Sequence, residues 1–282
     1  MKLTKWLAAV ACVYLALLLV FSFAAPFITG HDPVDVDLGS ILQPPQPGHL
    51  MGTDEMGRDI VSRLLYGARV SLSVGFASML VSLVAGVVYG TVSGYCGGWI
   101  DRIMMRLLDT LLSTPSLLIM IGAQAILSPG LLTVVLVIGL TGWMPLARLI
   151  RTEMFERKEE VFIQASIVAG ASPYRLFVRH LAPHSLPTIL VMSASGVGHA
   201  ILSESTLSFL GLGIPPHEAS WGNMLVGAQN HLLTGAWWAV AFPGAGIVLT
   251  VLAITFLGDW LQSRHGSPQF RNKWKGEKEH VC

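Results

Sequence analysis

The sequence has little charge. Only 12% of its 282 residues are Asp, Glu, Lys or Arg and 52% are hydrophobic, whereas soluble domains carry about twice that charged fraction. The mean hydropathy is +0.61. The net charge of +1 argues neither for nor against nucleic acid as a partner. These values exclude an ordinary soluble domain and favour a membrane protein.

Cysteine is also scarce. Cys12, Cys96 and Cys282 lie far apart and form no CxxC motif or Cys/His cluster, so free thiols are expected. His180 and His184 have the spacing of a zinc-binding helix. They lack the adjacent Glu of the metalloprotease pattern, and proline interrupts the helix between them, so no metal site is expected.

Motifs for nucleotide binding and for hydrolysis are missing. A Walker A loop ends in Gly-Lys-Ser/Thr, because its backbone N–H groups and its lysine hold phosphates. No lysine of this chain follows a glycine, and no Gly-x-Ser-x-Gly motif occurs. A membrane-anchored enzyme is therefore unsupported, and any energy that the chain uses is expected to come from a partner.

What the sequence does contain is long apolar runs. A helix rises about 1.5 Å per residue, so a run of about 20 residues crosses the hydrocarbon core. Ser128-Pro129-Gly130 forms a tight turn between the third run and the fourth. The pattern predicts an all-α membrane protein with six transmembrane helices, at Trp6–Phe27, Val70–Val92, Ile103–Leu127, Leu131–Ile150, Leu186–Leu207 and Trp238–Leu257.

The first run has an alternative interpretation as a secretory signal, because Lys2 and Lys5 precede it and small residues follow it. A signal core has about 7–15 residues and this run is longer, so an uncleaved first span is favoured.

Basic residues orient the spans. With the N-terminus in the cytoplasm, nearly all Lys and Arg fall in or beside the inner segments 1–5, 93–102, 151–185 and 258–282. The exceptions are Arg58, Arg63 and Arg69. This bias predicts a multi-pass protein of the bacterial cytoplasmic (inner) membrane with both termini in the cytoplasm.

Three regions are expected along the chain. Residues 1–69 would hold the first span, an external loop and an interfacial helix; residues 70–260 would form a core of five spans; residues 261–282 would be a cytoplasmic tail. In the interfacial helix, Ile60, Leu64 and Ala68 share one face while Arg58 and Arg63 lie on the other. That pattern fits a helix in the outer membrane interface, or a solvated surface helix packed on the spans.

A polar, charged stretch from Arg148 to Pro187 interrupts the apolar sequence. It predicts two short helices joined by a bend at Gly170, the second beginning with Ser172 as N-cap and Pro173 in the first turn. We expect the second helix to end near Pro183 and Pro187 to open the fifth span. The orientation makes this stretch a cytoplasmic loop.

Asp109, His199 and Glu204 are the functional candidates among the ionisable residues of the predicted spans, where such groups are costly and often functional. A pair with Arg106 or Arg102 is the favoured interpretation of Asp109. Glu204 lines a substrate path or bonds to a neighbouring span, with equal support for each. His199 faces a path or packs with a hydrogen bond, and the second is favoured.

In these features the chain resembles the integral membrane subunits of ATP-binding-cassette (ABC) importers, specifically the dipeptide/oligopeptide/nickel permease family. The resemblance covers nearly the whole chain. In the loop, the family's Glu-Ala-Ala signature with its glycine and Leu-Pro ending corresponds to Gln164-Ala165-Ser166, Gly170 and Leu181-Ala182-Pro183, so the first and third triplet positions depart from it. Further matches are Gly52-Thr53-Asp54, Gly57-Arg58-Asp59, Ser62-Arg63, Asp109, Glu204, Leu207–Gly213 and Phe242-Pro243-Gly244.

The resemblance implies a type I permease fold with a cytoplasmic coupling helix. The ATPase-coupling residues would be Gln164, Ala165, Ser166, Gly170, Ala171, Ser172, Arg175 and Pro183, and the external motif Gly52, Thr53, Asp54, Gly57, Arg58, Asp59 and Arg63. Implied partners are a homologous permease subunit, forming a heterodimer, two ABC ATPase subunits, an extracytoplasmic solute-binding protein and the lipid bilayer, with no nucleic acid. ATP and Mg²⁺ would be used by the ATPases, and this chain would bind no cofactor.

The family resemblance leaves the substrate open between di- or oligopeptides, which are favoured, and nickel or a metal chelate. The sequence also leaves open a different class of transport protein, an ATP-independent channel or secondary carrier. The two classes differ in whether uptake occurs without ATPase partners.

Overall fold

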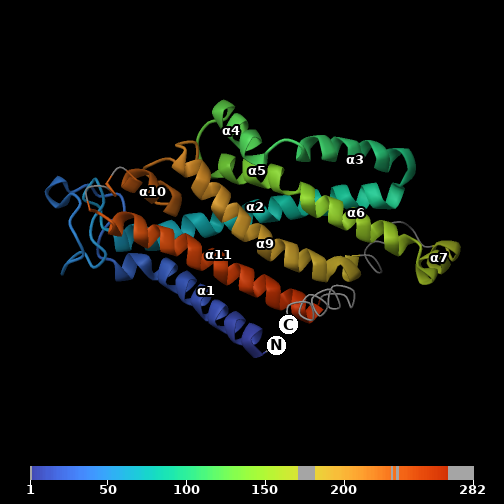
Figure 1. Cartoon of the computed structure of the whole chain (residues 1–282), viewed down its shortest axis with the longest axis horizontal. Coiled ribbons are helices and arrows are strands. Elements are labelled where there is room, and N and C mark those ends of the chain that lie inside the picture. Colours follow the sequence, from blue (N-terminus) through green and yellow to red (C-terminus); the bar gives the residue numbers. More distant parts are fainter. Residues whose placement is uncertain (1, 171–181, 230, 233–234, 266–282) are drawn as a thin grey trace, which may run out of the picture.

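The computed structural model describes residues 2–170, 182–229, 231–232 and 235–265 (Figure 1). Within these residues the regular structure is helical, with two isolated β-bridges and no strand. In chain order the elements are α1 Lys2–Ile28, η1 Leu38–Ser40, α2 Ile60–Cys96, α3 Gly98–Leu112, α4 Ser116–Ile126, α5 Leu131–Gly142, α6 Met144–Lys158, α7 Val161–Val168, α9 Ala182–Phe209, α10 Trp221–Gln229 and α11 Trp238–His265.

The structure confirms the six-span architecture. Five segments are long and apolar enough to cross a membrane, namely α1, α2, α5 with α6, α9 and α11, and the bent pair α3–α4 makes a sixth when it is counted as one span. The two helices of that pair meet at 83°, because Pro115 disfavours the helical conformation in the residue before it. The predicted turn at Ser128-Pro129-Gly130 joins α4 to α5.

The predicted interfacial helix is wrong as a separate element. Residues 60–96 form one helix of 37 residues, so the predicted domain boundary at 69/70 falls inside α2. Its polar face does not meet water, since Arg63 is 2% exposed and Asp59 6% exposed. The external segment 29–59 folds back over this face. The amphipathic pattern was correct, but the chain itself covers the polar side.

Around the fifth span the predicted boundaries also need correction. Helix α9 already begins at Ala182, and Pro187 lies inside it rather than opening it. Pro183 falls in the first helical turn, where a missing N–H costs nothing. In the preceding loop, α7 and Gly170 are described, whereas Ala171, Ser172 and Arg175 lie outside the described residues.

A row of glycines lets α2 and α6 pack with their backbones close together. A Cβ on Gly90 would lie 2.4 Å from the carbonyl oxygen of Ala147, and one on Gly94 2.7 Å from that of Arg151. Gly86 approaches Trp143 and Leu146 in the same way. Small residues at this spacing permit tight helix packing in membranes. This contact holds α6 along the C-terminal half of α2.

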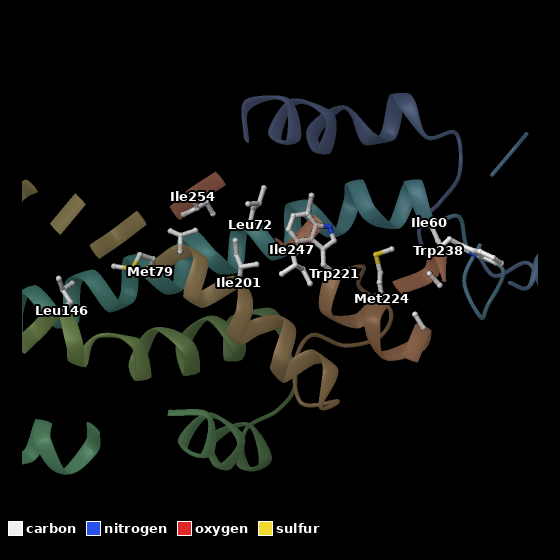
Figure 2. Close-up of a cluster of buried hydrophobic side chains, with 14 of the residues drawn as sticks. Ile60, Leu72, Met79, Leu146, Ile201, Trp221, Met224, Trp238, Ile247 and Ile254 are labelled. Carbon is white, nitrogen blue, oxygen red and sulfur yellow. The ribbon is translucent and has the colours of Figure 1, made fainter. Parts of the chain in front are cut away.

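The main apolar core lies between α2, α9, α10 and α11 (Figure 2). Trp221 at the start of α10 is fully buried, and its indole N–H donates to the carbonyl oxygen of Leu64 at 3.0 Å. Trp238 at the start of α11 donates to the carbonyl oxygen of Thr53 at 3.2 Å. Burial and these hydrogen bonds fasten α10 to α2 and α11 to the segment that precedes α2.

The glycine row gives a stability prediction. Gly90→Val should lower the free energy of unfolding by about 1–3 kcal/mol, because the new side chain must push α6 away from α2. Thermal unfolding of the purified protein in detergent measures the loss. Gly122→Val on α4 is the matched control, since nothing lies within 4 Å of a Cβ there. Equal stability of the Gly90 variant and the control would contradict the packing argument.

Candidate functional site: external motif, intramembrane cavity and inner loop

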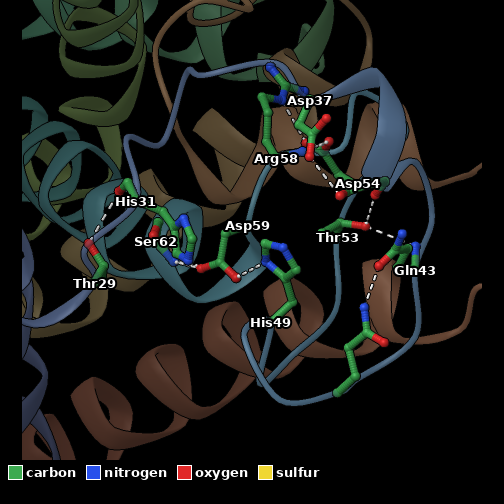
Figure 3. A network of polar contacts seen from close by, with 12 residues as sticks. Thr29, His31, Asp37, Gln43, His49, Thr53, Asp54, Arg58, Asp59 and Ser62 are labelled. Carbon is green, nitrogen blue, oxygen red and sulfur yellow. Dashed lines mark hydrogen bonds and ion pairs between the residues drawn. The ribbon is translucent and has the colours of Figure 1, made fainter.

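The residues of the external motif form one polar network at the outer end of α2 (Figure 3). Asp59 is the N-cap of α2; its carboxylate accepts from the backbone N–H of Ser62 at 2.8 Å and contacts the His49 ring at 3.0 Å. The hydroxyl of Thr53 accepts from the N–H of Gln43 at 2.8 Å and donates to the carbonyl oxygen of Ser40. The network ties the external segment to the helix.

Asp54 is the centre of this network. One carboxylate oxygen lies 2.7 Å from Nε of Arg58 and 3.4 Å from Nε of Arg63. The other accepts the backbone N–H groups of Met56 and Arg58 at 2.8 and 3.0 Å. A second contact of Arg63 is a hydrogen bond to the carbonyl oxygen of Pro33 at 3.3 Å. Asp54 therefore compensates two largely buried arginines.

Two glycines of the motif are required by geometry. Gly57 has a φ of +73°, and a Cβ there would lie 1.8 Å from the carbonyl oxygen of Asp37. Gly52 has a φ of +78°, and a Cβ would lie 2.6 Å from the carbonyl oxygen of Gln43. Every residue of the external motif thus helps to hold segment 29–59 against α2.

Asp54→Ala should lower the free energy of unfolding by about 3–5 kcal/mol, because it leaves Arg58 and Arg63 buried without their carboxylate. Asp35→Ala is the control on the same segment, since Asp35 is exposed and its side chain makes no hydrogen bond or ion pair among the described residues. That control should stay within about 0.5 kcal/mol of the parent protein. Thermal unfolding in detergent separates the two, and a harmless Asp54→Ala change would refute the buried-pair account.

Glu204 of α9 is fully buried among serine hydroxyls. Its carboxylate accepts from the hydroxyl of Ser208 at 2.8 Å and from that of Ser71 on α2 at 3.3 Å. Ser205 and Ser220 also hydrogen-bond to it. The hydroxyl of Ser71 in turn accepts the backbone N–H of Trp221 at 3.3 Å. Of the two interpretations left open, the geometry is that of a bond to a neighbouring span.

Removal of the Glu204 carboxyl group should therefore act on stability. Glu204→Ala should cost about 1–3 kcal/mol, because it leaves buried hydroxyls without an acceptor. Glu204→Gln should cost less, since the amide oxygen still accepts a hydrogen bond. Thr206→Ala, two residues further along α9 and exposed, is the control in the same unfolding assay. A Gln variant as unstable as the Ala variant would contradict the hydrogen-bonding role.

An open cavity of about 450 Å³ lies between α9, the α3–α4 bend and the α5–α6 junction. His199 lines it and is exposed, and its ring makes no hydrogen bond within the described part of the chain. Ser195 and Ser203, one turn to either side on α9, line it as well. In the described part of the chain, the helix face that carries His199 therefore borders open space and gives the ring no hydrogen-bonded packing partner.

Asp109 has a different partner from the expected one. Its carboxylate pairs with Arg148 of α6 instead of Arg106 or Arg102 of its own helix. Both side chains are more than half exposed in the single chain. The sequence did not reveal this pair, because it depends on α6 lying beside α3.

Helix α6 ends at Lys158, and α7 begins at Val161 after a break of two residues. Ile163 is 2% exposed and anchors α7, whereas Gln164 and Ala165 face outward. The Gln164 amide donates to the carbonyl oxygen of Lys158 at 2.8 Å. Val161 and Val168, on the side of α7 that carries Ala165, are 85% and 88% exposed. Val161, Ala165 and Val168 thus form a short exposed apolar strip on α7.

The arrangement of helices resembles that of a solved ABC transporter chain. It matches the structure described as "Inward facing conformations of the MetNI methionine ABC transporter", with a TM-score of 0.61 over 73% of this chain and 97% of that chain. At 16% sequence identity the likeness concerns the fold alone.

Sequence comparison then gives the family. Residues 86–266 match the family of binding-protein-dependent transport system inner membrane components, and the chain belongs to that family. It is 40% identical over 262 residues to the dipeptide transport system permease protein DppC of Bacillus subtilis strain 168, covering 93% of this chain and 82% of the relative. It is 36% identical over 253 residues to the di/tripeptide transport system permease protein DppC of Pseudomonas aeruginosa strain UCBPP-PA14, covering 87% and 83%. The chain is thus an ABC importer permease subunit of the inner membrane.

Sequence reasoning missed three residues that organise the site. Ser71 links Glu204 to α10, Trp221 fills the core, and Arg148 pairs with Asp109. A signal for Ser71 was present, since small residues recur every three to four positions along α2, at Ser71, Gly75, Ser78, Ser82, Gly86, Gly90 and Gly94. Such a row indicates a buried contact face.

Proposed function

We propose that this chain forms one half of a path that imports di- and oligopeptides, driven by separate ATPase subunits. The observation that carries the proposal is the 40% identity to a dipeptide permease across 93% of the chain. The relatives reported above are named for peptides, which favours peptide over nickel or metal-chelate import. A homologous permease subunit would complete the path as a heterodimer, and a solute-binding protein would deliver the peptide from outside.

The arrangement of the helices supports the orientation in this proposal. The external segment and α10 lie at one end of the bundle, whereas α7, the start of α1 and the end of α11 lie toward the other (Figure 1). The basic residues gather at the second end, which would then be cytoplasmic, with both termini there.

Loop 151–185 would transmit the work of ATP hydrolysis. The exposed strip of Val161, Ala165 and Val168 on α7 offers an apolar surface to an ATPase subunit, and α7 follows α6 after a break of two residues. A push on α7 would therefore reach the contact between α6 and α2. ATP and Mg²⁺ would be bound by the two ATPase subunits, and this chain would hold no cofactor.

The test is uptake by proteoliposomes that hold the complete complex and its solute-binding protein. Peptide uptake should require ATP hydrolysis and should stop with Ala165→Arg, because a charged side chain on the exposed strip opposes docking. Ala165 is exposed, so this change causes no clash inside the chain. Thr152→Arg, exposed on α6, is the control and should transport normally.

Three results would count against this function. Uptake by this chain without ATPase subunits would favour a channel or secondary carrier. Uptake of nickel but not of peptides would show that the complex imports the metal and not peptides. Normal ATP-driven uptake by Ala165→Arg would remove the coupling role of α7.

A further inference from the structure

The cavity beside His199 lies at the middle of the spans that surround it. Each of these spans contributes lining residues from near its own midpoint: Met79 and Ser82 of α2, Pro115 between α3 and α4, Met144 in the span of α5 and α6, and His199 of α9. Spans cross the bilayer from one face to the other, so their midpoints meet near its centre. The cavity therefore lies about halfway between the external segment and the inner loop.

Two interruptions of the helical backbone also meet at this cavity. Thr114 and Pro115 lie where α3 ends and α4 begins, and Gly142 and Met144 flank the break between α5 and α6. Irregular backbone at membrane depth is tolerated where protein covers it or where it lines a water-filled cavity. Transporters of other folds hold their substrates near the bilayer centre, between interrupted helices. The two interruptions therefore suit a cavity that holds water or a solute.

One side of the cavity is a polar row on α9. Ser195, His199 and Ser203 follow one another at intervals of four residues, so they lie on one face of the helix, and all three line the cavity. Hydroxyl and imidazole groups both donate and accept hydrogen bonds. Among the described residues that line the cavity, none is Asp, Glu, Lys or Arg. The polar row can therefore bind the N–H and C=O groups of a peptide without selecting for charge.

The rest of the cavity wall is rich in methionine. Sδ of Met79 lies against α9, since a Cβ on Gly196 would come within 2.1 Å of it. A methionine side chain is unbranched and turns about three rotatable bonds, so a wall of methionines adapts to ligands of different shapes. Four of the chain's 11 methionines gather here from four helices, namely Met79 of α2, Met120 of α4, Met144 of α6 and Met192 of α9.

The cavity has the size and composition of a small-ligand site. Its volume of about 450 Å³ falls within the range of about 300–1,000 Å³ usual for such sites, which are mostly apolar with a few polar groups. We propose that it is this subunit's binding site for a peptide in transit. The polar row holds the peptide backbone, and the methionines surround an apolar side chain.

This inference rests on the proposed function and deepens it, because it states which peptides fit. The methionine wall accepts apolar side chains of different shapes. A charged side chain is disfavoured, since it would lose its water without gaining a charged partner. A lipid acyl chain and side chains of the second permease subunit are the competing occupants of the cavity.

The first test asks whether a peptide enters the cavity. A dipeptide with a benzophenone side chain, which reacts readily with methionine C–H bonds on irradiation, is supplied to the complete complex during ATP-driven uptake. Mass spectrometry should find the label on one or more of the four methionines, and an excess of an unlabelled apolar dipeptide should remove it. Absence of label from these methionines, or label that excess peptide does not reduce, would overturn the inference.

The second test changes the size of the cavity. Ser195 is exposed in the cavity wall, so the ring added by Ser195→Phe enters open space. The ratio of uptake of a bulky apolar dipeptide to uptake of glycylglycine should then fall by about tenfold, because the ring takes the room of the bulky side chain. Thr206→Phe, exposed on α9 and outside the cavity lining, is the matched control and should keep the ratio.

A variant in the opposite direction completes this test. Met192→Ala enlarges the same cavity and should raise the uptake ratio, so a result is obtained even where Ser195→Phe transports nothing. An unchanged ratio in a transporting variant of this pair would overturn this inference alone. Absence of any ATP-driven peptide uptake by the unmodified complex would overturn the proposed function as well.

Discussion

The close contact between α2 and α6 is the constraint on which the rest of this molecule depends. Helices gain little from the hydrophobic effect inside a membrane and associate through packing and polar contacts. Here Gly86, Gly90 and Gly94 remove the side chains that would keep the two backbones apart. The position of α6 then determines where its arginines lie. Arg151 pairs with Asp101 and Arg148 with Asp109, so α3 is held by α6 as well as by α2.

The same contact links the membrane to the inner loop. Because α7 follows α6 after two residues and Ile163 anchors it, a displacement of α7 would be passed to a helix that packs closely on α2. At the outer end, α2 is equally fixed, through Asp54, Thr53 and the two tryptophans. One long helix thus connects the external segment, the intramembrane cavity and the surface proposed to receive the ATPase.

Much of this architecture is encoded in local sequence patterns. Apolar runs of span length gave the helices, and the turn at Ser128-Pro129-Gly130 was visible from its composition. What covers the polar face of residues 58–69 could not be predicted from the sequence. Amphipathicity shows that a helix has two different faces, but not what packs on each of them. Arg63 looked solvated and is buried under the external segment. Likewise, the partner of Asp109 depends on tertiary packing that spacing along one helix does not contain.

The most direct measurement of the central claim is site-directed cross-linking of α7 in the assembled, cysteine-free complex. The account predicts that a cysteine at position 165 cross-links to an ATPase subunit, and that a cysteine at position 152 does not. Cross-linking from position 152 with none from position 165 would contradict a transport cycle driven through this helix.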